Sequence, residues 1–355
     1  MIMLLESVPA LAIVWFILVA VLWVGFFFLE GFDFGVGMLL PVLGKDNKTR
    51  RVMINAIGPV WDGNEVWLLT AGGATFAAFP GWYASLFGGL YLPLFLVLVG
   101  LIIRGVAFEY RAKNDDPKWR TMFDTFIILG SFLPTLVLGV GFANMAIGLA
   151  NDGLVWNGSF WGLFGPFALV GGLLFVTLFL THGAAYIALK TKGEIQQAAS
   201  KLSGMVGILA LVLLLAYVVA QNIFYPAKSE FGDLSIFAWV TGIVSVVALA
   251  ASLLLTRKGR DGIGFIMTGA AIAMLIVTIF LRLYGNIGFA QDTSVAATER
   301  LNILTAASSE TTLTLMTVAA AIFVPIVLAY QAWSYWVFHK RISTKNIPDP
   351  VEAVA

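Results

Sequence analysis

The sequence predicts an all-α integral membrane protein with nine transmembrane helices. Its 355 residues are 60% hydrophobic and only 12% charged, whereas a soluble domain carries about 25% charged residues. The apolar residues form long runs along the whole chain, and basic residues gather after every second run. This combination is typical of a polytopic membrane protein and excludes a soluble globular fold.

Nine apolar runs are long enough to cross a bilayer, which takes about 20 helical residues. They cover residues 9–43, 51–78, 81–108, 119–142, 160–189, 200–220, 234–256, 262–284 and 310–338. The first run is long, and its second half, "LEGFDFGVGMLLP", is rich in glycine. Because glycine lets helix backbones approach closely, we expect this half to pack tightly against its neighbours.

The basic residues define an orientation. Seventeen of the 21 follow the odd-numbered runs: Lys45, Lys48, Arg50, Arg51, Arg111, Lys113, Lys118, Arg120, Lys190, Lys192, Lys201, Arg257, Lys258, Arg260, Lys340, Arg341 and Lys345. Since basic residues accumulate in cytoplasmic loops, the N-terminus is expected outside and the C-terminus in the cytoplasm. The first run lacks a preceding basic region and a cleavage site, so we interpret it as a retained helix rather than a signal peptide.

The chain is expected to form a single polytopic membrane domain, 1–355. The first four runs, within 1–142, would form one four-helix bundle, and the next four, within 160–284, would form a second. Residues 310–338 add a ninth helix, and 339–355 form a cytoplasmic tail with a disordered end. "LEGFDFGVGMLLPVLGK" and "LTHGAAYIALKTKGE" both place a polar residue and a glycine before a basic loop, which is as compatible with an inherited repeat as with coincidence.

The composition also limits the chemistry of the chain. There is no cysteine, so disulfides, thiolate metal sites and iron–sulfur clusters are excluded. A net charge of +1 gives no indication of a nucleic-acid partner. The two histidines are His182, inside a run, and His339, at the inner surface. One intramembrane histidine cannot ligate several haems, and His182 is equally explained as a hydrogen-bonded interior residue or a weak member of a proton relay.

Ionisable residues inside apolar runs are energetically costly and usually mark function. Glu30 and Asp33 lie in the first run, Asp62 and Glu65 in the second, and Arg104 in the third. A spacing of three residues puts each acidic pair on one helix face. At 1.5 Å per residue, Asp33 and Asp62 lie roughly 16 Å from the inner loop, and Glu30 and Glu65 roughly 20 Å. We therefore expect four carboxylates at matching depths on adjacent helices.

Four carboxylates at one level repel each other unless some are protonated, paired with Arg104 or facing water. Three interpretations remain open on the residues alone. The acids could form a proton relay or a polar seam toward a partner chain. They could instead hydrogen-bond a neighbouring helix and fix its register, or hold a hard cation such as Mg²⁺ or Ca²⁺.

Four longer motifs narrow the choice. "EGFDFGVGMLLP", "INAIGPVWDGNEVWLLTAGGATFAAFP", "RGVAFEYR" and "VPIVLAYQAWSYWVF" together resemble subunit II of the cytochrome bd quinol oxidases. The resemblance extends over essentially the whole chain and is most specific over residues 30–80. It implies a complex in a bacterial or archaeal cell membrane that oxidises quinol and reduces dioxygen to water, electrogenically and without proton pumping.

The resemblance also implies where the cofactors and partners are. The haems, two of b type and one of d type, would belong to subunit I, the heterodimer partner, while this chain would ligate no cofactor or metal and carry no catalytic residue. It would act as a scaffold for subunit I and contribute to proton delivery from the cytoplasm. A small accessory subunit, and a quinone bound here as a structural lipid, are left open.

Individual roles follow from the same resemblance. Asp62, in "WDGNEVW", would belong to a hydrophilic path that carries protons toward the oxygen-reducing haem, and Trp67 resembles a residue near the mouth of a dioxygen tunnel. Glu65 would extend the path or serve only as a hydrogen-bond partner. Glu30 and Asp33 would support the polar seam. Arg104 is the candidate for a structural ion pair.

Two other function classes compete with the oxidase subunit. A proton- or cation-coupled transporter would share the midplane acids and the internal repeat, but the sequence shows no pair of clearly broken helices around a substrate site. A purely structural partner without chemistry is the third class.

Overall fold

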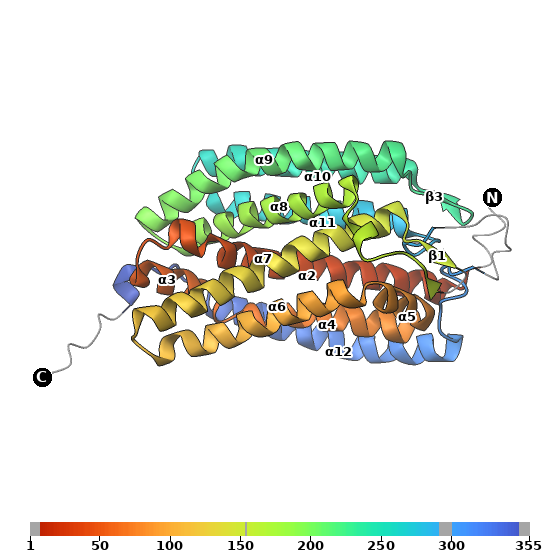
Figure 1. The fold of residues 1–355 in the computed structure, drawn as a ribbon, viewed down its shortest axis with the longest axis horizontal. Helices are drawn as coiled ribbons and strands as arrows, with labels where there is room; N and C mark the ends of the chain where they lie inside the picture. The colour runs from red at the N-terminus through yellow and green to blue at the C-terminus, as the bar shows by residue number, and fades with distance from the viewer. Residues whose placement is uncertain (1–7, 153–154, 291–299, 348–355) are drawn as a thin grey trace, which may run out of the picture.

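The computed structural model describes residues 8–152, 155–290 and 300–347, so the tail end expected to be disordered lies outside the described residues. The described chain is almost entirely helical. Its α-helices are α2 Ala10–Leu43, α3 Asn47–Ile57, α4 Trp61–Ala78, α5 Pro80–Gly89, α6 Tyr91–Tyr110, α7 Pro117–Ile147, α8 Pro166–Lys190, α9 Glu194–Phe224, α10 Ser235–Arg257, α11 Asp261–Leu283 and α12 Glu310–Val337. Two short hairpins, β1 Asn151–Asp152 with β2 Val155–Trp156 and β3 Lys228–Ser229 with β4 Gly232–Asp233, lie at the end where α2 begins (Figure 1).

Eight of the described helices are long and apolar enough to cross a membrane: α2, α6 with the short 3₁₀ turn Arg111–Lys113, and α7 to α12. This confirms the predicted all-α, multi-pass class. From α7 onward the helices match the predicted runs, apart from a few residues at their ends.

Two predicted runs are not continuous helices, and the sequence-based boundaries are wrong there. Residues 51–78 divide into α3 and α4, with a break at residues 58–60, "GPV". Pro59 has no amide hydrogen to continue the helical ladder, which explains the break. Residues 81–108 divide into α5 and α6 at Leu90, directly after Gly88 and Gly89.

Helix α2 is the centre of the molecule, because it packs against α4, α7, α8 and α11 (Figure 1). Its tightest crossing is with α8. A Cβ atom on Gly183 would lie 2.6 Å from the Cα atom of Gly35, so the crossing depends on having no side chain at either glycine. Nearer the start of α2, the ring of Phe27 packs edge-on against Phe142 and Phe175, at centroid distances of 4.9 and 5.2 Å.

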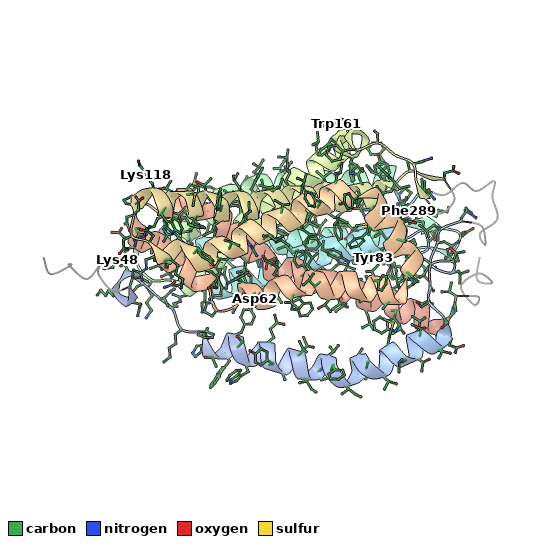
Figure 2. The ribbon with its side chains drawn as sticks, turned by 60° about the horizontal axis from the view of Figure 1, so that its bottom comes forward. Lys48, Asp62, Tyr83, Lys118, Trp161 and Phe289 are labelled. Atoms are coloured by element: carbon green, nitrogen blue, oxygen red, sulfur yellow. The ribbon has the colours of Figure 1, made fainter. Side chains whose placement is uncertain are left out.

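Helix α12 lies along one side of the bundle, and Leu313 is its only residue that is buried among those described (Figure 2). Near its start, the Trp15 indole donates to the Thr317 hydroxyl at 3.0 Å. Its second polar attachment, near its end, joins Gln331 and Tyr335 to Asn64 and Trp67 of α4.

Candidate functional site

Three of the four predicted acids meet the predicted arginine where side chains of α2, α4 and α6 come together. Glu30 and Asp33 come from α2, Glu65 from α4 and Arg104 from α6. Glu30, Asp33 and Arg104 have no exposed surface, whereas the Glu65 side chain is 24% exposed. We call these four residues the acid–arginine cluster.

Arg104 is the centre of this cluster. Its Nη2 donates to a carboxylate oxygen of Glu30 and to one of Glu65, the latter at 3.0 Å. Its guanidinium also lies over the ring of Phe34, 4.6 Å from the centroid, which is a favourable cation–π contact. Gly130 on α7 makes room for the arginine, because a Cβ atom there would lie 2.7 Å from the Arg104 Cβ.

Asp33 is bonded to an amide rather than to the arginine. The Asn64 side-chain amide donates to Asp33 Oδ2 at 2.6 Å, and Asn64 Oδ1 accepts from the Tyr335 hydroxyl at 2.7 Å. The amide of Gln331 lies 3.4 Å from the same Asn64 oxygen. A polar chain therefore runs from Tyr335 on α12 through Asn64 to Asp33, and it attaches α12 to the bundle.

The sequence interpretation missed Asn64, Gln331 and Tyr335. All three lie in the motifs "WDGNEVW" and "LAYQAWSYWVF", but they are neutral, and only charged side chains stand out in an apolar run. Asn64 could have been found from its position, since it directly precedes Glu65 and is two residues after Asp62. The contacts of α12 could not have been found, because they depend on how that helix docks.

The cluster contains more acid than base. It holds three carboxylates but one guanidinium, and Glu30 Oε2, Asp33 Oδ1 and Arg104 Nε and Nη1 are buried without a protein hydrogen-bond partner. Leaving unpaired charges in a buried site costs several kcal/mol per ion. The cluster therefore holds an excess of carboxylates over guanidinium in a place where an uncompensated charge is costly. In the described part of the chain, no three His, Asp or Glu side chains come together as a metal site would require.

Asp62 does not join the cluster. It lies on the exposed side of α4 (Figure 2), whereas Asn64 is buried and Glu65 turns toward Arg104. Two residues three apart on a helix differ by about 60° in direction. That difference is enough to separate Asp62 from the buried acids, so only three of the four carboxylates expected at one level lie together.

Trp67 lies one turn beyond Asn64 on α4. Its indole ring packs against α2 where Gly25 leaves space, since a Cβ atom on Gly25 would lie 2.2 Å from the ring. Its Nε1 donates to the Gln331 side-chain oxygen at 3.0 Å. Trp67 is thus held between α2 and α12, beside the acid–arginine cluster but without a hydrogen bond to its carboxylates in the described residues.

His182 is fully buried on α8, away from the acids, and both of its ring nitrogens are bonded. Nε2 lies 3.0 Å from the Phe28 carbonyl, to which it can only donate, and Nδ1 lies 2.6 Å from the Thr268 hydroxyl. In the neutral ring Nε2 carries the hydrogen, and Nδ1 faces the Thr268 hydroxyl, which is also placed to donate to the Phe265 carbonyl at 2.8 Å. The ring also stacks on Phe265 at 4.6 Å. Both nitrogens thus lie against groups of this chain, and the ring is held between α2, α8 and α11.

Comparison with known proteins places the chain in a family. Residues 11–338 match the family model described as cytochrome bd terminal oxidase subunit II. The chain is 39% identical to the cytochrome bd ubiquinol oxidase subunit 2 of Bacillus subtilis, over 94% of this chain and 97% of that protein. It is 35% identical to the cytochrome bd-I ubiquinol oxidase subunit 2 of Escherichia coli K12, over 95% and 96%.

The fold agrees with this assignment. A chain of the bd oxidase from Geobacillus thermodenitrificans superposes with a TM-score of 0.74 at 17% identity, over 93% of this chain and 99% of that one. The residues matched by the family model include all eight apolar helices except the first residue of α2. The chain therefore belongs to the family of subunit II of the cytochrome bd terminal oxidases.

Proposed function

We propose that this chain is the haem-free subunit of a complex that oxidises a membrane quinol and reduces dioxygen to water. Its membership of the subunit II family supports this function, as does the name of the B. subtilis relative, a ubiquinol oxidase subunit. The complex would lie in a bacterial or archaeal cell membrane, with subunit I as partner and as carrier of the b and d haems. The fully bonded His182 is in keeping with haem ligation by that partner.

The role that we propose for this chain, beyond scaffolding, is proton delivery. The observation that carries it is the acid–arginine cluster, with its excess of carboxylates over guanidinium and its buried unpaired oxygens. Asp62 lies one helical turn from Glu65 and on the exposed side of α4, where a partner subunit can contact it. Protons would pass from the cytoplasm by way of Asp62 toward subunit I, with Glu65, Glu30 and Asp33 as the adjoining acids.

The membrane topology is part of the proposal. We infer that α4 is the ninth crossing, although Asp62, Asn64 and Glu65 make it less apolar than the other eight. An odd number of crossings is supported by the ribbon, in which α2 begins and α12 finishes at opposite ends of the bundle (Figure 1). The basic loops put the end of α12 on the cytoplasmic side. The two four-helix bundles remain part of the same proposal.

Trp67 and an apolar pocket beside it are the candidate binding sites for small apolar ligands. The pocket, of about 280 Å³, lies between α2, α4, α5, α6 and α7, and Trp23, Leu68, Phe87 and Phe142 are among its lining residues. We assign Trp67, directly before Leu68, to the proposed dioxygen route. The apolar lining would equally suit the isoprenoid chain of a structural quinone.

Purification tests the proposed function directly. A tagged form of this chain should co-purify with a haem-bearing protein whose reduced spectrum shows b and d bands. A transporter would instead purify alone and colourless. If this chain purified without a partner protein, or without haem bands, the oxidase proposal would be overturned. A small accessory subunit would be detected as a third band.

A further inference from the structure

A polar pocket, separate from the apolar pocket described above, lies at the end of the bundle that carries basic loops. It is formed by the first half of α9, the end of α10 and the start of α11. Its volume is about 570 Å³, within the range of about 300–1,000 Å³ typical of ligand sites. It is lined by Gln196, Gln197, Ser200, Lys201, Gly204, Met205, Ile208, Thr256, Arg257, Gly259 and Asp261. None of these residues takes part in the proposed proton path.

Two cations line this pocket without a counter-ion. In the described part of the chain, no carboxylate oxygen lies within 4.0 Å of Lys201 or Arg257. The Arg257 guanidinium lies beside Gly204 on α9, which has no side chain to cover it. A Cβ atom added at Gly204 would lie 4.0 Å from Arg257 Nε. Paired ammonium and guanidinium groups are the usual partners of a phosphate.

A buried threonine lies behind these cations. Thr256 also lines the pocket and is 2% exposed. Its Oγ1 is packed toward Gly264 on α11, where an added Cβ atom would lie 2.3 Å from it. The donors that a phosphate in the pocket could reach are therefore Lys201 and Arg257.

The pocket also contains one acceptor to which the phosphodiester of a lipid has no hydrogen to donate. Asp261 Oδ2 accepts from the Gln196 amide at 2.8 Å and lies 4.0 Å from Arg341, but Oδ1 is buried and has no partner. A ligand that carries a hydroxyl as well as a phosphate would bond both Asp261 and the cations. With Lys201 and Arg257, Asp261 gives the pocket a net charge of +1, which matches a singly charged anion.

The remaining wall is apolar and faces outward. Met205 and Ile208 line the pocket on α9 and are 61% and 49% exposed. They continue from the basic end of the helix along its membrane-spanning part. A ligand bound at the cations could therefore lay hydrocarbon chains along α9.

We propose that this pocket binds the headgroup of an anionic glycerophospholipid. Its phosphate would accept from Lys201 and Arg257, its headgroup hydroxyl would donate to Asp261, and its acyl chains would lie against Met205 and Ile208. Basic pockets between helices at a membrane surface are suited to such headgroups. The lipid would join α9 to the junction of α10 and α11 and so stabilise the second half of the bundle.

The test uses the delipidated, detergent-purified oxidase complex and added phosphatidylglycerol. Native mass spectrometry counts the bound lipid, and thermal unfolding measures its effect. K201Q/R257Q is compared with K258Q/R260Q. The control removes the same amount of charge from exposed residues between α10 and α11 that do not line the pocket. We expect the apparent Kd for phosphatidylglycerol to rise at least about tenfold in K201Q/R257Q, the effect of losing one charged hydrogen bond. The control should keep the wild-type Kd.

Three results would overturn the proposal: equal losses in both double variants, no stabilisation of the wild type by phosphatidylglycerol, or equal stabilisation by phosphatidylcholine or by inorganic phosphate. Phosphatidylcholine lacks the hydroxyl and the net charge, and inorganic phosphate lacks the chains. If K201Q/R257Q does not assemble, R257Q alone should show a smaller rise in Kd in the same direction, and an unchanged Kd there contradicts the site. Because lipid binding is measured without turnover, the result is independent of the proposed proton path.

Discussion

At the scale of single residues, Arg104 decides the chemistry of the buried acids. It neutralises part of the charge of Glu30, which is fully buried, and of Glu65, which is 24% exposed, whereas Asp33 is bonded to Asn64. Such a pair need not add net stability, because burial of both ions is costly. Removal of one partner, however, leaves the other charge buried and uncompensated.

Arg104→Gln should therefore destabilise the complex by about 3–5 kcal/mol, the cost of breaking a buried pair from one side. Chemical unfolding in detergent measures the change. Arg120→Gln is the control, because Arg120 pairs with Asp115, whose side chain is 94% exposed, and exposed pairs are worth about 1 kcal/mol or less. If the two substitutions lower the free energy of unfolding equally, the buried ion pairs of Arg104 contribute no more to stability than an exposed pair.

The site could be predicted in part from charge. Glu30, Asp33, Glu65 and Arg104 were found because charged groups are rare in apolar runs, and depth along the helices brought them together. Asp62 was expected in the same group, but the helical offset of about 60° turns it to the exposed side. Tyr335 carries no charge, and its contact with Asn64 depends on tertiary docking, so no local pattern could reveal it.

At the scale of elements, glycines determine how closely the central helices approach. The crossing of α2 and α8 places Gly35 against Gly183, and a Cβ atom on Gly35 would lie 2.0 Å from the Phe179 carbonyl oxygen. Because backbone atoms cannot move aside as a flexible side chain would, the helices would have to separate. The glycine-rich half of the first run predicted this packing, whereas its partner on α8 was not predicted.

Gly183→Ala should destabilise the protein by about 1–3 kcal/mol through overpacking. The matched control is Gly141→Ala on α7, where nothing lies within 4 Å of the added Cβ and the better helix propensity of alanine should leave stability unchanged or raise it by up to about 1 kcal/mol. Thermal unfolding midpoints compare the two. A loss at Gly141 as large as that at Gly183 would contradict the crossing described.

The start of α3 offers a pH-dependent test. The Asp46 carboxylate accepts from the Thr49 backbone amide at 2.8 Å, and this bond lowers the pKa of Asp46 below its usual 3.8. A lowered pKa in the folded state means stability that is present at neutral pH and is lost as the pH falls through that pKa. Asp46→Ala should thus cost about 0.5–2 kcal/mol at pH 7 and progressively less toward pH 3.

Asp46→Asn is the control for this cap, because asparagine caps a helix about as well as aspartate but does not titrate. It should keep most of the stability at pH 7 and lose the acid-dependent part. Unfolding curves between pH 3 and pH 7 test both variants. If Asp46→Ala is as stable as the wild type at pH 7, the cap does not contribute.

The breaks in the helices also belong to this scale. Hydropathy placed 51–78 in one run, because Gly58, Pro59 and Val60 are not polar enough to interrupt it. The backbone rules for proline predict the break there, and the structure has it between α3 and α4. Hydropathy thus predicted a multi-pass helical chain but not the break within this run.

At the scale of the whole molecule, one side remains incompletely covered. Asp62 is exposed on α4, and α12 buries only Leu313 among its described residues. A carboxylate on the outside of a membrane helix is costly against lipid, so a partner chain is the better neighbour for it. This argues for a function that is completed by another subunit rather than by this chain alone.

Turnover of the assembled oxidase tests that claim most directly. Asp62→Asn removes the proton-carrying group while leaving shape and hydrogen bonding similar, and Glu109→Gln, at an exposed carboxylate near the end of α6, is the control. We predict that Asp62→Asn assembles with full b and d haem content but turns over on the order of tenfold more slowly, as loss of a proton-transfer group allows. Glu109→Gln should turn over normally. Normal turnover of Asp62→Asn, or loss of haem from it, would contradict the proposed proton path.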